Sequence, residues 1–221
     1  LQAQYPDKKI IFHDIVVSWE DIGSKEPHIR TILQPKTTLM DVNIATALWF
    51  ASGGGETNES STSSEATTSS ERPRILLLGM GADELLGGYG RHRTAFDKGG
   101  WDSLQKELQL DQARFWERNL GRDDRIVADH SREARFPFLD YHVTQFLQSL
   151  PLSSICDFTL PPGQGDKRIL RLVATRLQIQ HASGLVKRAI QFGSRISHLS
   201  DAKRFGSRRK AKGDATIQAH K

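Results

Sequence analysis

A short apolar run that leads directly into a glycine turn and two acids is the feature that most constrains this fold. The run is Ile75–Leu78, and an all-apolar run of this length is typical of a parallel strand covered on both faces. Gly79 and Gly81 follow and allow a sharp turn and close approach of a phosphorylated ligand. Asp83 and Glu84 then begin the next element. The segment predicts a strand, a turn and a helix, the order found in α/β nucleotide-binding domains.

The two acids allow two interpretations. Carboxylates at this point can hold Mg²⁺, which prefers one or two hard oxygens together with the phosphates of a nucleotide. Acidic residues also favour the first turn of a helix for electrostatic reasons alone. Asp83 and Glu84 by themselves do not decide between the two.

Further motifs occur in the order that one family shows. They are LGMGADELLGGYG at 78–90, RDDR at 122–125, SREARFPFLD at 131–140, GDKRILR at 165–171 and KRAIQFGS at 187–194. Together they resemble the synthetase domain of asparagine synthetases, and the last motif is similar to the divergent eukaryotic members. The combination of GADE with EARFPFLD at this spacing is far more specific than either motif alone.

The resemblance implies an α/β fold of the adenine-nucleotide alpha-hydrolase-like (PP-loop) class, with a parallel sheet and a helical C-terminal part. Synthetases begin this domain with a strand and an SGGxDS pyrophosphate loop, and no segment here matches either. We therefore expect residues 1–200 to form an N-terminally incomplete asparagine synthetase domain. No N-terminal cysteine glutaminase domain is recognisable.

The activity that the resemblance implies is ATP-dependent amidation of aspartate through β-aspartyl-AMP, with Mg²⁺ as cofactor and ammonia or glutamine as nitrogen donor. If active, the chain is expected to be a ligase of the glutamine-hydrolysing asparagine synthase type, and to be inactive in isolation. The implied catalytic residues are Lys187, Asp83 and Glu84, with Asp83 also binding the metal. The implied nucleotide-binding residues are Gly79, Met80, Gly81, Ala82, Asp124 and Arg135.

One substitution leaves the activity open. Family synthetases have a glutamate where this chain has Met80, and a thioether can neither take up a proton nor act as a hard ligand for a cation. Three readings follow: an asparagine synthetase, a catalytically degenerate relative that serves as a binding or interaction module, or an adenylating amidotransferase for another carboxylate.

Composition divides the chain further. Residues 51–73 are rich in Ser, Thr and Gly without a large apolar side chain, which predicts a disordered insertion. Residues 186–221 carry a net charge of +8 and the preceding 185 residues a net −3, so the basic character belongs to the end of the sequence. We expect residues 201–221 to be a disordered basic tail, and we expect no nucleic-acid contact apart from this tail. A homodimer is also expected.

Hydrophobic periodicity predicts a strand over 9–17 and helices over 41–50, 101–120, 141–150 and 166–177, with Asp166 as an N-cap. For His92, a carboxylate partner or a surface helix is favoured over catalysis. The single cysteine excludes a disulfide framework and fits a reducing compartment. No stretch approaches the roughly 20 apolar residues of a membrane span, so no membrane partner and a cytoplasmic location are expected.

Overall fold

The computed structural model describes residues 6–8, 10, 13–54, 73–194 and 196. By their contacts, the residues divide into two compact units. The first contains residues 1–76, 121–134 and 188–221, and the second contains residues 77–120 and 135–187. The expected disordered tail at 201–221 and most of the expected insertion, residues 55–72, lie outside the described residues.

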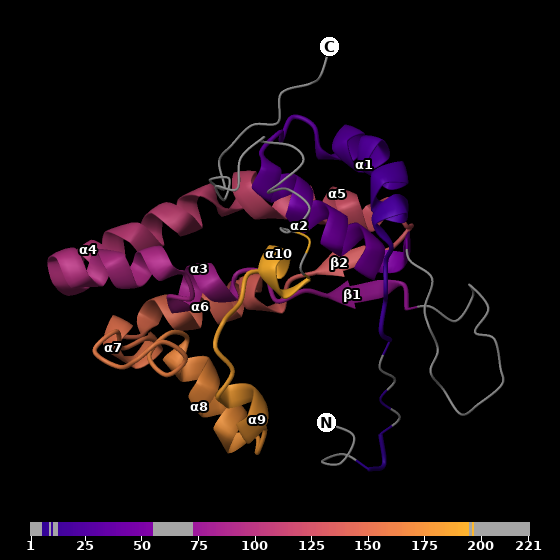
Figure 1. Cartoon of the computed structure of the whole chain (residues 1–221). Helices are drawn as coiled ribbons and strands as arrows, with labels where there is room; N and C mark the ends of the chain where they lie inside the picture. The colour runs from indigo at the N-terminus through magenta and orange to yellow at the C-terminus, as the bar shows by residue number, and fades with distance from the viewer. Residues whose placement is uncertain (1–5, 9, 11–12, 55–72, 195, 197–221) are drawn as a thin grey trace. The chain divides into compact units, whose positions relative to one another are not determined.

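The first unit is helical. Its helices are α1 (Trp19–Leu33), α2 (Leu39–Trp49), the π-type turn η1 (Phe50–Gly54), α5 (Gly121–Ala128) and α10 (Ile190–Gly193). Helices α1, α2 and α5 pack against one another, and α10 packs on α2 (Figure 1). Ser18 caps α1 through a capping box with Asp21, and the hydroxyl of Thr38 caps α2 by accepting the amide of Asp41.

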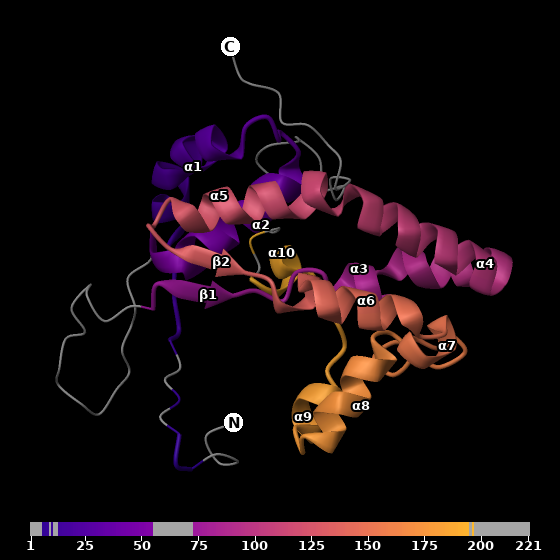
Figure 2. The same cartoon turned by 180° about the vertical axis from the view of Figure 1, so that it is seen from behind.

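The sheet consists of β1 (Ile75–Leu77) and β2 (Glu133–Arg135), seen side by side in Figures 1 and 2. The amide of Glu133 donates to the carbonyl of Arg74, and the amide of Leu78 donates to the carbonyl of Arg135. Both bonds advance in the same direction along the two strands, so the pairing is parallel. The division between the two units falls inside both strands.

The second unit is also mostly helical. Its elements are α3 (Ala82–Leu86), α4 (Gly90–Phe115), η3 (Trp116–Leu120), η4 (Pro137–Leu139), α6 (Tyr141–Ser149), α7 (Leu152–Ile155), α8 (Arg168–Arg176) and α9 (Gln180–Ser183). Helix α4 is broken at Gly99 and Gly100, whose backbone angles are not helical. The α/β class with a small parallel sheet is therefore confirmed, with helices making up most of the described chain.

Two buried clusters form the core of the second unit. Leu85 and Leu86 of α3 pack with Leu147 and Ile155, and this cluster is what orients α3. The second cluster contains Leu104, Leu108, Cys156 and Phe158. Burial raises the pKa of the Cys156 thiol to about 12, so this cysteine is an unreactive part of the core.

Several expectations need correction. The strand predicted over 9–17 is absent from the described part of that segment, where Ile15 makes only an isolated bridge. The expectation that β1 is covered on both faces is wrong, since Ile75 and Leu77 are 42% and 72% exposed. The two-stranded sheet leaves this face of β1 uncovered. The sequence shows that these residues are apolar, but not whether another element covers them.

The helices were predicted more accurately than the strands. The helix over 141–150 is confirmed as α6, whereas that over 101–120 belongs to α4 and continues into η3. Residues 51–54, assigned to the insertion, continue from α2 in η1. Asp166 does not cap α8: Lys167 holds that position in a left-handed conformation, and the carboxylate of Asp166 pairs with Arg171 instead. Among the described helices, none is both long and apolar enough to cross a membrane.

Candidate active site

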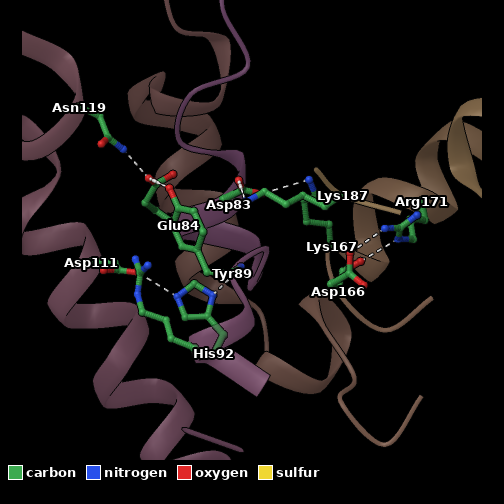
Figure 3. Close-up of polar contacts among 11 residues, drawn as sticks. Asp83, Glu84, Tyr89, His92, Asp111, Asn119, Asp166, Lys167, Arg171 and Lys187 are labelled. Atoms are coloured by element: carbon green, nitrogen blue, oxygen red, sulfur yellow. Dashed lines mark hydrogen bonds and ion pairs between the residues drawn. The ribbon is translucent and has the colours of Figure 1, made fainter. Parts of the chain in front are cut away.

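Asp83 lies between two lysines at the start of α3 (Figure 3). The Nζ of Lys167 is 3.0 Å from Oδ1 of Asp83, and the Nζ of Lys187 is 3.3 Å from Oδ2. The three side chains are 20–23% exposed, which leaves each one accessible to a ligand. The cluster has one negative and two positive charges, so it carries a net +1 and attracts an anion.

Two glycines allow Asp83 to lie where it does. Gly81 has φ +94°, and a Cβ there would come within 2.6 Å of the Leu139 side chain. A Cβ on Gly88 would come within 2.0 Å of Oδ1 of Asp83, and the amide of Gly88 donates to the carbonyl of Asp83 at 2.8 Å. The chain therefore folds back against Asp83 at a distance that only glycine permits.

Lys167 reaches the site through an unusual backbone conformation. Its φ of 52° is left-handed, which is uncommon for a residue with a side chain. Its amide donates to the carbonyl of Leu86, the last residue of α3, at 3.0 Å. This bond fixes the start of α8 against the end of α3 and brings the Lys167 ammonium to Asp83.

Lys187 lies in a segment without regular secondary structure, Leu185–Ala189. Arg171 anchors the start of this segment, because its Nη1 donates to the carbonyl of Leu185 at 2.9 Å and to that of Ser183 at 2.7 Å. The Lys187 ammonium also lies 4.7 Å from the centre of the Tyr89 ring. Lys187 therefore has two partners, a carboxylate and an aromatic face.

Glu84 faces a different environment from Asp83. It is 4% exposed, and its Oε1 accepts hydrogen bonds from the hydroxyl of Tyr89 and the side-chain amide of Asn119. Burial and the neighbouring Glu84 carboxylate raise the pKa of Tyr89 well above its ordinary value, so the phenol stays protonated and donates. Of the two acids, Asp83 is the one that a ligand can reach.

The turn before α3 contains the other predicted nucleotide-binding residues. Gly79 is exposed, and a Cβ there would meet nothing within 4 Å, so the space beside it is open. Met80 is half-buried, and Ala82 is buried as the first residue of α3. The structure thus brings residues 79–82 into one turn with Asp83.

The last two predicted residues lie on other elements. Arg135 is exposed at the end of β2, and its carbonyl accepts the amide of Leu78, which holds the chain just before the turn. Asp124 is exposed on α5 in the first unit. Its neighbour Asp123 is fully buried and accepts a hydrogen bond from Arg122 at 2.8 Å, which is a structural contact.

A buried network fixes the start of α4 beside the site. The amide of Tyr89 donates to Nδ1 of His92 at 3.3 Å, so the proton of the neutral imidazole is on Nε2, which donates to Asp111 at 2.9 Å. Arg91 and Arg114 also bind Asp111. Burial alone would raise the pKa of Asp111, but hydrogen bonds from His92 and Arg91 hold it at about 2. The carboxylate partner expected for His92 is confirmed.

The side chains fit Mg²⁺ only in the presence of phosphate. No group of three His, Cys, Asp or Glu residues that could hold a metal occurs in the described part of the chain. Asp83 offers one accessible carboxylate, and Mg²⁺ is commonly bound by one or two carboxylates with the substrate phosphates completing its shell. Two ammonium groups beside it suit phosphate oxygens.

Sequence reasoning did not place Lys167, Tyr89 or Asn119 at this site. Lys167 is 84 residues from its partner Asp83, and Asn119 is 35 residues from Glu84. The signal that could have identified Lys167 is the DKRILR motif, which resembles a segment of the family. No local pattern marks Asn119.

Comparison with known proteins gives the family. The asparagine synthase family model matches residues 20–179. The chain is 45% identical over 201 residues to asparagine synthetase domain-containing protein 1 of Gallus gallus, and 42% identical over 205 residues to that of Homo sapiens. Each alignment covers 90% of this chain and 31% of the relative.

A more distant relative extends the likeness. An asparagine synthetase domain-containing protein of Saccharomyces cerevisiae is 32% identical over 210 residues, covering 94% of this chain and 37% of the relative. The chain thus spans about a third of the length of these relatives. The resemblance to the eukaryotic domain-containing members is confirmed. This chain belongs to the asparagine synthase family.

Proposed function

We propose that this chain supplies the Asp83 side of an active site that amidates aspartate at the expense of ATP. The observation that carries the proposal is the cluster of Asp83, Lys167 and Lys187 directly after β1. Ligands of α/β folds bind outside the carboxyl ends of the strands, and this cluster lies at such an end. The substrates proposed are ATP, aspartate and ammonia or glutamine.

The chemistry requires control of charge. A carboxylate oxygen of aspartate attacks the α-phosphorus of ATP, and pyrophosphate leaves; ammonia then attacks the acyl carbon, and AMP leaves. When bound, Mg²⁺ offsets the charge of the phosphates. Asp83 would hold the metal. The ammonium groups of Lys167 and Lys187 would then move partly or wholly from Asp83 to oxygens of the departing pyrophosphate.

The remaining predicted residues support this arrangement. The turn of Gly79, Met80, Gly81 and Ala82 would approach the nucleotide through its backbone, because the space beside Gly79 is open. Glu84 would support Tyr89, since its buried oxygen is already occupied. Asp124 and Arg135 are kept as nucleotide-lining residues on the family resemblance alone. A cytoplasmic location and a homodimer accompany the proposal as predictions.

The test is exchange of labelled pyrophosphate into ATP, which reports the adenylation step. It is measured on a longer protein that joins this chain to an SGGxDS pyrophosphate loop, because the chain is expected to be inactive in isolation. We expect exchange to require aspartate and to be abolished by Asp83→Asn, which removes the charge that binds Mg²⁺. Asp97→Asn is the matched control, because Asp97 is exposed on α4. Aspartate-independent exchange, or equal rates in both Asp variants, would contradict the proposal.

Met80 favours a second candidate, a domain that binds Mg²⁺-polyphosphate without forming the amide. A thioether cannot take up the proton that ammonia loses. In a protein that joins this chain to an SGGxDS pyrophosphate loop, we expect Met80→Glu to raise ammonia-dependent asparagine formation by up to roughly a hundredfold if proton transfer limits the reaction. Polyphosphate binding that depends on Asp83, without product in either variant, would establish the binding domain instead.

A further inference from the structure

We infer that Tyr89 is a positioning residue whose ring holds the Lys187 ammonium beside Asp83. Lysine has a flexible stem with about 2 kcal/mol of rotamer entropy, so an ammonium is placed accurately only if its surroundings restrict it. The backbone around Lys187 has no regular structure. Its side-chain placement must therefore come from what the ammonium touches.

Two groups contact it, Asp83 and the ring of Tyr89, and all three side chains are labelled in Figure 3. Asp83 provides the opposite charge at 3.3 Å, and the Tyr89 ring lies 4.7 Å from the ammonium, within the range of a cation–π contact. Asp83 alone would not fix Lys187, because Lys167 competes for the same carboxylate. The ring contact is the one that Lys187 does not share with Lys167.

Tyr89 is held at two points, its hydroxyl and its backbone amide. Its hydroxyl donates to the buried Glu84, which Asn119 also binds. Its backbone amide donates to His92, and His92 is fixed by the buried Asp111. A side chain anchored through both its backbone and its hydroxyl presents its ring in one orientation. This assigns a role to Glu84, Asn119 and the His92–Asp111 pair that the reaction itself leaves unexplained.

A second cation, Arg91, also lies over the Tyr89 ring. The guanidinium carbon of Arg91 lies 4.0 Å from the ring centre. The two cations pair with different carboxylates, Arg91 with Asp111 and Lys187 with Asp83, which limits their mutual repulsion. When Asp83 binds a metal, the ring would keep Lys187 at the site as its carboxylate partner becomes occupied. This last step rests on the proposed function.

The direct test is NMR of the chain with ¹³C-methylated lysines, since methylation keeps the charge. Methyl groups over an aromatic face move upfield. We expect the methyl signal of Lys187 to lie upfield, and its loss in Lys187→Arg identifies it. The upfield position should persist in Tyr89→Phe. In Tyr89→Leu the signal should move to the ordinary lysine position. Tyr141→Leu is the control, because it removes a tyrosine that is 66% exposed on α6. An unshifted Lys187 signal in the unmodified sequence, or no change in Tyr89→Leu, would overturn the inference.

Binding of Mg²⁺-pyrophosphate gives a second readout. We expect Tyr89→Leu to weaken affinity roughly two- to fivefold, the size of an exposed cation–π contact, and to have no effect in a Lys187→Met background. Equal losses in both backgrounds would show a merely structural role for Tyr89. Absence of all pyrophosphate binding would count against the proposed function while leaving the NMR result to decide the role of Tyr89.

Discussion

Asp83 is the residue on which the site depends, and its environment is unusual because two lysines share one carboxylate. The ion pairs are formed without any ligand, at 3.0 Å and 3.3 Å. A metal must therefore compete with two ammonium groups for Asp83. Phosphate oxygens would relieve this competition by binding the lysines. Metal and polyphosphate are thus expected to bind cooperatively, with a coupling that resides in these three side chains.

This coupling predicts opposite effects of one substitution. We expect Lys167→Met to raise the affinity for Mn²⁺ alone by roughly three- to tenfold, equivalent to about 0.6–1.4 kcal/mol, because Asp83 loses a competing cation. The same change should weaken pyrophosphate binding. Paramagnetic relaxation of water measures the first and calorimetry the second.

Lys106→Met serves as the control, because Lys106 is exposed on α4 and the substitution changes the net charge equally. The same gain of Mn²⁺ affinity in Lys106→Met would show a general charge effect and refute the coupling at Asp83.

Helix α4 is the element that links the site to the interior of the second unit. Its first turn carries His92, which is fully buried and hydrogen-bonded to Asp111, 19 residues further along the same element. The bond spans the break at Gly99 and Gly100, so the two parts of α4 fold back on each other. Asp111 therefore holds the start of α4, and with it Tyr89.

The low pKa of Asp111 predicts a pH dependence of stability. Because the folded pKa is about 2 and the unfolded value about 3.9, the stabilisation is complete above pH 4 and is lost as the pH falls towards 2. This difference in pKa corresponds to roughly 2–3 kcal/mol of stability. Denaturant unfolding of the unmodified chain and of Asp111→Asn, between pH 2 and 6, measures it.

The Asp111 variant should be less stable near neutral pH and should lose the part of the pH dependence that lies between pH 4 and 2. An unchanged acid slope in Asp111→Asn would show that other carboxylates account for it.

The elements also show what the sequence could and could not predict. Amphipathic periodicity predicted α6, because apolar residues on the buried face of a helix recur at a regular spacing in the sequence. The exposed face of β1 was not predictable, since Leu77 is apolar whether or not another element covers it. In the site, the motif with Asp83 and the family-like Lys187 were found, and the structure brings them together. Lys167 was missed because its approach depends on one left-handed backbone conformation.

At the scale of the whole molecule, each unit combines buried apolar side chains with a buried ion network. In the first unit, Arg122 donates to Asp41 and Asp123, both at 2.8 Å. Burial alone would lower the pKa of Arg122, but the two carboxylates raise it above its ordinary value. The network ties α5 to the start of α2.

Breaking this network should destabilise the first unit strongly. We expect Arg122→Met to cost about 3–5 kcal/mol, because it leaves two buried carboxylates without their cation. Arg30→Met should cost less than about 1 kcal/mol, since it removes a partly exposed pair with Glu26 on α1. Denaturant unfolding followed by the fluorescence of the buried Trp49 compares them, and equal losses would contradict a special role for Arg122.

The chain passes between the two units four times, after residues 76, 120, 134 and 187. Helix α10 packs on α2 although about 140 residues separate them in the sequence. During synthesis on a ribosome, α2 therefore emerges long before the helix that covers it, and the entire second unit is made in between. Neither unit corresponds to one continuous stretch of the gene, so a single recombination junction cannot transfer either of them intact to another protein.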